Sequence, residues 1–107
     1  MTSNGMTLDA IASRWSALEN RGLPDGHFKF SVNGRSVTLV QSEIAGMILT
    51  YLQTNGSLGS RQRSALQSLI KELESGLSTM NDDCKSYFGD LLSIAGDVLG
   101  IAHDQPV

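Results

Sequence analysis

The chain contains few of the residues from which metal sites, disulfide scaffolds and most active sites are built. Its 107 residues include one cysteine, Cys84, and two histidines, His27 and His103. A single cysteine cannot form an internal disulfide, and we expect Cys84 to be a buried structural residue. Neither histidine has a cysteine or a second histidine at the spacing of metal ligands. The sequence therefore predicts a protein with no catalytic site, no bound metal and no cofactor.

Long apolar runs and an excess of positive charge are also missing. The most apolar stretch, residues 91–102, is interrupted by Ser93, Asp97 and two glycines, whereas a transmembrane helix needs about 20 apolar residues. The N-terminus lacks the basic and apolar regions of a signal peptide. Eight basic residues against eleven acidic ones give a net charge of −3, so the strongly basic surface typical of nucleic-acid binding is absent. We expect a cytoplasmic protein that does not bind membranes.

What the sequence does contain is enough apolar material for one small core. Hydrophobic residues make up 40% and charged residues 18% of the chain, a balance that suits a single globular domain of this length. We expect that domain over residues 7–103, with a disordered N-terminus at residues 1–6 and a C-terminal tail at residues 104–107. The expected fold is mainly α, with about four helices and one β-hairpin between the first and the second.

Apolar residues recur at steps of three and four in four segments, which is the spacing of one helix face. The predicted helices span residues 9–21, 42–54, 60 to about 80 and 82–102, with Thr7 and Ser42 as caps of the first two. The side chains expected to anchor the core are Trp15, Phe28, Phe30, Ile48, Leu69, Leu73, Leu91, Leu92 and Val98.

Residues 27–40 predict the β-hairpin. Apolar residues alternate with polar ones on both sides of Asn33 and Gly34, from Phe28 before the pair to Leu39 after it. Asn-Gly is typical of a two-residue type I′ turn, in which both residues have positive φ. Because an isolated hairpin is marginal in water, its apolar face should pack on the helices.

The predicted fourth helix contains a short internal repeat. Residues 89–95 and 96–102 are identical at five of seven positions. One basic and five acidic residues give residues 80–107 a net charge of −4, against +1 from seven basic and six acidic residues in residues 1–79. Four aspartates stand seven residues apart and form an acidic stripe: Asp83, Asp90, Asp97 and Asp104. The stripe is interpreted either as a docking surface for a basic partner or as an ordinary solvated helix face.

Ile94 and Ile101 lie one heptad apart beside the acidic stripe. An apolar strip rimmed by charges of one sign suits a basic, amphipathic partner protein or a second copy of the chain. We therefore predict a non-enzymatic protein-interaction module of adaptor, chaperone, immunity or inhibitor type. The predicted partner-binding residues are Asp83, Asp90, Ile94, Asp97 and Ile101. In the alternative interpretation, the third helix covers both isoleucines.

A stretch of about 35 residues resembles the opening of a winged helix-turn-helix domain of the response-regulator kind. In that family a short hairpin leads into one helix, and a glycine-containing loop then opens a second. The resemblance implies a DNA-binding transcriptional regulator as the alternative function. It rests on residues 32–39, Ser42-Glu43-Ile44, Leu49, Leu52, Asn55-Gly56 and Ser60-Arg61-Gln62 with Leu66.

The chain departs from that family where an arginine-rich recognition helix should stand. The stretch from Asp82 onward is acidic, and phosphates would repel it. The link between the second and third helices is also longer than a tight turn. A protein partner is therefore the main prediction, and nucleic acid is the alternative. Under that alternative, the DNA contacts fall on Lys29, Arg35, Arg61, Arg63 and Lys71.

Overall fold

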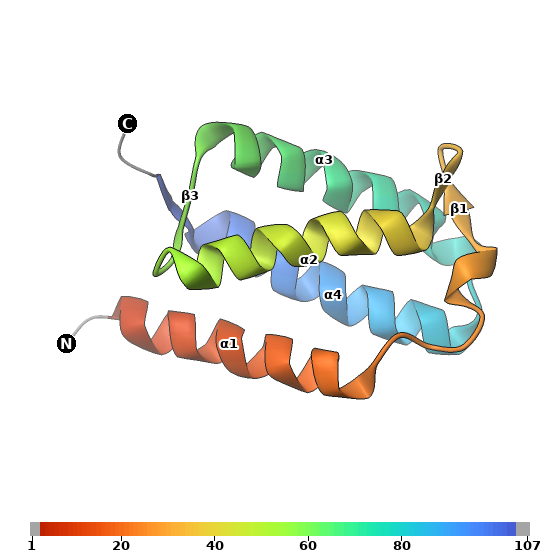
Figure 1. Ribbon diagram of the computed structural model, residues 1–107, viewed down its shortest axis with the longest axis horizontal. Helices are drawn as coiled ribbons and strands as arrows, with labels where there is room; N and C mark the ends of the chain where they lie inside the picture. The colour runs from red at the N-terminus through yellow and green to blue at the C-terminus, as the bar shows by residue number, and fades with distance from the viewer. Residues whose placement is uncertain (1–2, 105–107) are drawn as a thin grey trace.

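Four helices make up most of the fold in the computed structural model, which describes the backbone of residues 3–104 and the side chains of residues 8–102 (Figure 1). The helices are α1 (Ser3–Arg21), α2 (Val37–Gln53), α3 (Ser60–Gly76) and α4 (Asp82–Ile101). Two short 3-10 turns, η1 (His27–Lys29) and η2 (Leu77–Thr79), join them. The predicted fold class is confirmed: the chain is mainly helical, with a small hairpin between α1 and α2.

The core lies around α4, which packs against each of the other three helices. In Figure 1, α2 passes in front of α4, with α1 and α3 on either side. A wide arc of α4 is buried, running from Cys84 to Val98, so the broad apolar face in the sequence reflects three intramolecular neighbours. The predicted core residues that are buried are Trp15, Ile48, Leu69, Leu73, Leu91, Leu92 and Val98.

The hairpin is shorter than predicted. Strands β1 (Ser31–Val32) and β2 (Arg35–Ser36) pair antiparallel, with Ser31 opposite Ser36 and Val32 opposite Arg35. Asn33 has a φ of 50° and Gly34 a φ of 77°, which confirms the predicted turn with two positive φ angles. Residues 27–29 form η1 and residues 37–40 begin α2, so the prediction of strands there is wrong.

Helix α2 begins early because its apolar residues also fit a helical period. Val37, Val40 and Ile44 are completely buried, which matches steps of three and four rather than two. Ser36, and not the predicted Ser42, caps the helix: its hydroxyl accepts a hydrogen bond from the Thr38 backbone N–H at 3.2 Å. In the helix Leu39 turns outward and is 52% exposed.

The prediction that Phe28 anchors the core is also wrong. Its side chain is 68% exposed, because η1 replaces the strand that would have turned it inward. Phe30 is partly buried against the core. The residue that ties the hairpin to the bundle is Val32, which is buried against α3 at Gly76.

Both ends of the described chain differ from the expected boundaries. Helix α1 begins at Ser3, so the backbone of residues 3–6 is helical and Thr7 is not its cap; residues 1 and 2 lie outside the described residues. Strand β4 (His103–Asp104) pairs parallel with β3 (Ser57–Leu58). The start of the predicted C-terminal tail therefore returns to the loop between α2 and α3, and residues 105–107 lie outside the described residues.

Candidate functional site

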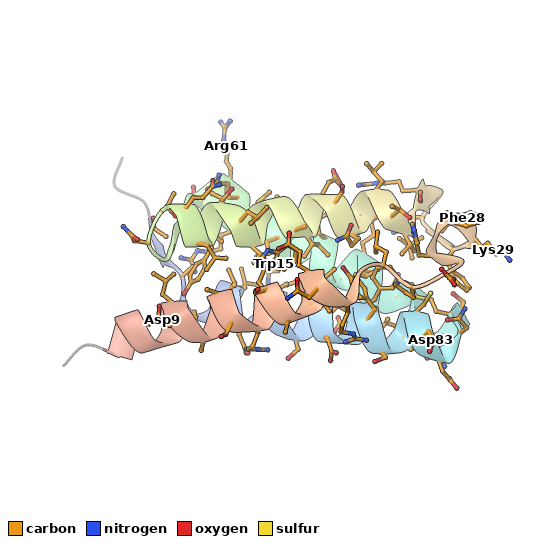
Figure 2. The ribbon with its side chains drawn as sticks, turned by 60° about the horizontal axis from the view of Figure 1, so that its bottom comes forward. Asp9, Trp15, Phe28, Lys29, Arg61 and Asp83 are labelled. Atoms are coloured by element: carbon orange, nitrogen blue, oxygen red, sulfur yellow. The ribbon has the colours of Figure 1, made fainter. Side chains whose placement is uncertain are left out.

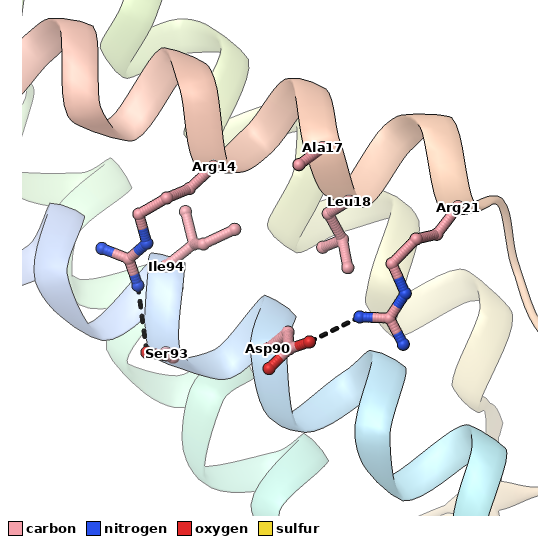
Figure 3. A pocket seen from close by; sticks show the side chains of 7 residues that line it. All are labelled: Arg14, Ala17, Leu18, Arg21, Asp90, Ser93 and Ile94. Carbon is pink, nitrogen blue, oxygen red and sulfur yellow. Dashed lines mark hydrogen bonds and ion pairs between the residues drawn. The ribbon is translucent and has the colours of Figure 1, made fainter.

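Two arginines of α1 face the acidic stripe of α4. Arg14 Nη1 donates to Asp97 Oδ2 at 2.6 Å, and Arg21 Nη1 donates to Asp90 Oδ2 at 2.5 Å. Because the two helices run antiparallel, residues seven apart on α1 meet residues seven apart on α4. Figure 3 shows the pair of Arg21 and Asp90. Two of the four aspartates of the stripe are therefore ion-paired within the chain.

Each arginine also binds a serine that lies one helical turn before its aspartate. Arg14 Nη2 donates to Ser93 Oγ at 3.0 Å, and Arg21 Nη2 donates to Ser86 Oγ at 3.2 Å. The Arg21 guanidinium also stands 5.8 Å from the centroid of the Tyr87 ring, within the range of a cation–π contact. The same arginine–serine–aspartate arrangement thus occurs twice along the α1–α4 contact.

Between the two arginines lies a small recess of about 200 Å³ (Figure 3). Ala17 and Leu18 of α1 and Ile94 of α4 form its apolar part. Ile94 is only 3% exposed and lines this recess together with α1 side chains. The recess is a gap within a helix–helix contact whose rim charges are already neutralised.

The other predicted partner-binding residues lie apart from this recess. Asp83 is exposed in the first turn of α4, and Ile101 is 37% exposed at the opposite end of that helix. The side chain of Asp104 lies outside the described residues. The structure thus brings Asp90, Ile94 and Asp97 together beneath α1 and leaves Asp83 and Ile101 separate from them and from each other.

Two of the five basic residues predicted for DNA contact are used within the fold. Arg35 forms ion pairs with Glu43 and with Glu72, the latter at 3.5 Å. Arg63 Nη2 donates to the Ala102 carbonyl at 2.7 Å, and its Nη1 donates to the Leu99 carbonyl. Both carbonyls stand at the C-terminus of α4, where helix carbonyls lack partners.

The remaining three basic residues do not gather at one place. Lys29, Arg61 and Lys71 are exposed. Lys29 projects from one end of the bundle and Arg61 from the other (Figure 2). Such a separation gives little support to a continuous phosphate-binding surface.

The side chains that could act as nucleophiles, general bases or metal ligands are the cysteine and the two histidines. Cys84 is buried, and burial, followed by the nearby Asp83 carboxylate, raises the pKa of its thiol. His27 Nδ1 lies 2.6 Å from Thr38 Oγ1, while the side chain of His103 lies outside the described residues. Within the described part of the chain, no three His, Cys, Asp or Glu side chains form a possible metal cluster, and no helix is long and apolar enough to cross a membrane.

Phe28 is the functional candidate that the sequence analysis missed. It sits in η1, a turn opened by Gly26 with a φ of 80° and closed by the Lys29 N–H, which donates to the Gly26 carbonyl at 3.0 Å. The His27 ring meets the Phe28 ring edge to face at 5.9 Å and is itself anchored to Thr38 of α2. Figure 2 shows Phe28 and Lys29 at the same end of the bundle. We call these two residues the η1 surface.

Comparison with known proteins supplies no function. No family model matches the chain, and no curated protein and no solved structure matches it. The resemblance to the response-regulator winged helix therefore stays a prediction, and a function has to be argued from the surfaces described above.

Proposed function

We propose that this chain is a small non-enzymatic interaction module of the cytoplasm, and that it binds a protein partner through the η1 surface. The observation that carries the proposal is Phe28, the most exposed large apolar side chain of the described residues at 68%. Aromatic residues are enriched in the cores of protein interfaces. Burying a phenylalanine contributes about 1.5–3 kcal/mol, which is enough to dominate a small contact.

The turn around Phe28 supports this role because it is already ordered before any partner binds. The Phe30 N–H donates to the His27 carbonyl at 3.3 Å, and the Val37 N–H donates to the Phe30 carbonyl at 3.0 Å. These bonds join η1 to the hairpin and to the first turn of α2. A ring held on such a turn loses little conformational entropy on binding.

The charges favour the η1 surface over the acidic stripe. A basic partner at the stripe would compete with Arg14 and Arg21 for Asp97 and Asp90. Lys29, next to Phe28, is exposed and has no ion pair within the described residues. We therefore infer a partner that offers an apolar pocket with an acidic rim. The free thiol of Cys84 suits a reducing compartment.

Binding measurements on two matched variants test the proposal. The partner captured by the wild-type chain from its native host is purified, and its Kd is measured for wild type, Phe28→Ser and Ile101→Ser. Phe28→Ser should weaken binding at least about tenfold, because the buried ring is lost. Ile101→Ser removes an exposed apolar side chain from the predicted α4 surface and should leave binding unchanged.

Both substitutions lie on the surface and should alter the free energy of unfolding by less than about 0.5 kcal/mol. Urea denaturation checks this. Equal Kd values for wild type and Phe28→Ser would contradict the proposal, and a loss confined to Ile101→Ser would transfer the site to α4.

A further inference from the structure

The chain contains three Asn-Gly pairs, which begin at Asn4, Asn33 and Asn55. Asparagine followed by glycine is the pair most prone to spontaneous loss of the side-chain amide, because glycine has no Cβ to shield its backbone nitrogen. The rate of this reaction in a folded protein depends on how firmly that nitrogen is held. The side chain of Asn4 lies outside the described residues, whereas those of Asn33 and Asn55 are both exposed.

The pair Asn33-Gly34 is open to solvent at the tip of the hairpin. Both residues are exposed, and a Cβ built at Gly34 would meet no atom within 4 Å. The Gly34 N–H donates to no acceptor among the described residues. The strands beside the turn consist of two residues each, so the turn can open without unfolding the helices. Solvent and base therefore reach the Gly34 nitrogen.

The pair Asn55-Gly56 is held closed although its asparagine is exposed. Gly56 is buried, and its N–H donates to the Tyr51 carbonyl at 2.8 Å. The residues on either side of the pair are bonded to each other, since the Ser57 hydroxyl donates to the Thr54 carbonyl at 3.2 Å. A Cβ at Gly56 would lie 3.6 Å from the Tyr51 ring, so that ring covers the glycine. A nitrogen whose proton is held in a buried hydrogen bond is a poor nucleophile.

We propose that Asn33 is a site of spontaneous deamidation in the folded protein, and that the fold protects Asn55 from the same reaction. The Gly34 nitrogen loses its proton to hydroxide and attacks Asn33 Cγ. A new C–N bond forms, and the side-chain amide nitrogen leaves as ammonia with a proton taken from water. A second water molecule then opens the cyclic imide at either carbonyl, which gives aspartate or isoaspartate. The reaction needs only water and base, and it is independent of the η1 surface.

Isoaspartate at position 33 disrupts the turn. Its main chain passes through Cγ and is longer than that of asparagine, so it no longer fits a two-residue turn with two positive φ angles. The residue just before it, Val32, is 5% exposed and lies against Gly76 of α3. A distorted turn therefore weakens the contact that ties the hairpin to the bundle, and the aged protein is less stable than the fresh one.

Peptide mapping of the aged protein tests the proposed site. The purified chain is kept at physiological temperature and mildly alkaline pH, digested with trypsin at intervals and analysed by mass spectrometry. Trypsin cleaves after lysine and arginine, so residues 30–35 report on Asn33 and residues 36–61 report on Asn55. Amide loss from the folded chain should be at least about tenfold faster at Asn33 than at Asn55. In guanidinium chloride, which unfolds the chain, the two rates should become similar.

Asn33→Gly is the matched variant for the effect on stability. Gly-Gly also suits a type I′ turn, so the variant keeps the hairpin while it lacks the reactive amide. After the same incubation, part of the wild-type protein should unfold at a lower urea concentration, whereas Asn33→Gly should keep a single midpoint.

Three results would overturn the proposal. In the first, Asn33 and Asn55 lose their amides at equal rates in the folded chain. In the second, the Asn33 amide survives in the folded chain over a period in which the unfolded chain loses it. In the third, the aged wild type contains isoaspartate at position 33 and yet keeps the midpoint of the fresh protein.

Discussion

Arg14 and Arg21 hold α1 against α4 through the same set of contacts, repeated one heptad apart. Their aspartate partners are well exposed, with 57% of the Asp97 side chain and 60% of the Asp90 side chain accessible to solvent. Exposed ion pairs contribute little to stability because water screens them. The two clamps therefore set the register of α1 on α4, while Ile11, Trp15 and Leu18 beneath them supply most of the free energy of packing.

A double-mutant cycle on Arg21 and Asp90 measures how much this ion pair contributes to stability. Arg21→Ala, Asp90→Ala and the double variant should give a coupling energy of at most about 1 kcal/mol, decreasing as salt is added. Urea denaturation at low and high ionic strength provides the values. A coupling energy several times larger, or one that salt leaves unchanged, would show that the pair is a principal source of stability.

The buried thiol of Cys84 and the buried phenol groups of Tyr51 and Tyr87 make the free energy of unfolding depend on pH in the alkaline range. Burial is the largest cause that raises the pKa of each group, above ordinary values of 9.0 for cysteine and 10.0 for tyrosine. A group whose pKa is higher in the folded state favours folding below its ordinary pKa and loses that contribution as pH rises through the folded value. The free energy of unfolding should therefore be level just below pH 9 and fall at higher pH.

Chemical denaturation at a series of alkaline pH values checks this expectation. Tyr51→Phe removes one of the three titrating groups while keeping the ring, so its stability should fall less steeply than that of the wild type. Stability that increases above pH 9, or an equal slope for both proteins, would contradict the assignment of these groups.

At the scale of elements, the start of α2 shows why the hairpin could be predicted only in part. Asn33 and Gly34 adopt positive φ, as local sterics alone demand. The residues after the turn fit two periods: Val37 and Leu39 match a strand, while Val37 and Val40 match a helix. Val40 and Ile44 are both buried, which favours the helix over the strand. Their burial depends on tertiary neighbours, which cannot be identified from the sequence.

Gly76 is the point where the hairpin and α3 depend on each other. A Cβ at Gly76 would lie 2.2 Å from Val32 Cγ1, so Gly76→Ala forces the hairpin to move and should destabilise the protein by about 1–3 kcal/mol. Gly96→Ala is the control, since no atom lies within 4 Å of a Cβ built there. In a helix interior that change should stabilise by about 0.5–1 kcal/mol.

The comparison is made by urea denaturation of the two variants and the wild type. Opposite signs for the two substitutions are the expected result. If both alanines stabilise the protein alike, the contact between Val32 and Gly76 does not constrain the fold.

At the scale of the whole molecule, the uneven distribution of charge along the sequence leads to ion pairs within the chain. The N-terminal part of the chain supplies Arg14 and Arg21, and the acidic C-terminal part supplies Asp90 and Asp97. Periodicity predicts the acidic stripe and the four helices because both follow from residue spacing along one element. It could not reveal what faces the stripe, since the contact joins residues separated by 69 and 83 positions.

The same limit applies to the candidate site. The alternating pattern around Phe28 predicts an inward ring, and only the 3-10 turn opened by Gly26 exposes it. The predicted α4 surface rests on residues that share one helix face, but Ile94 is buried beside Ala17 and Leu18 of α1, whereas Ile101 is 37% exposed. A surface that arises from the packing of several elements can be identified only once the fold is known.

Photo-cross-linking in the native host shows directly whether a protein partner is recognised at the η1 surface. A photoreactive phenylalanine analogue is placed at position 28 in one variant and at position 101 in another, both of which are exposed. Position 28 should give a discrete adduct with a second protein, of a mass different from that of a dimer of the chain, and position 101 should give none. Adducts from position 101 alone would contradict it and would place the partner on α4.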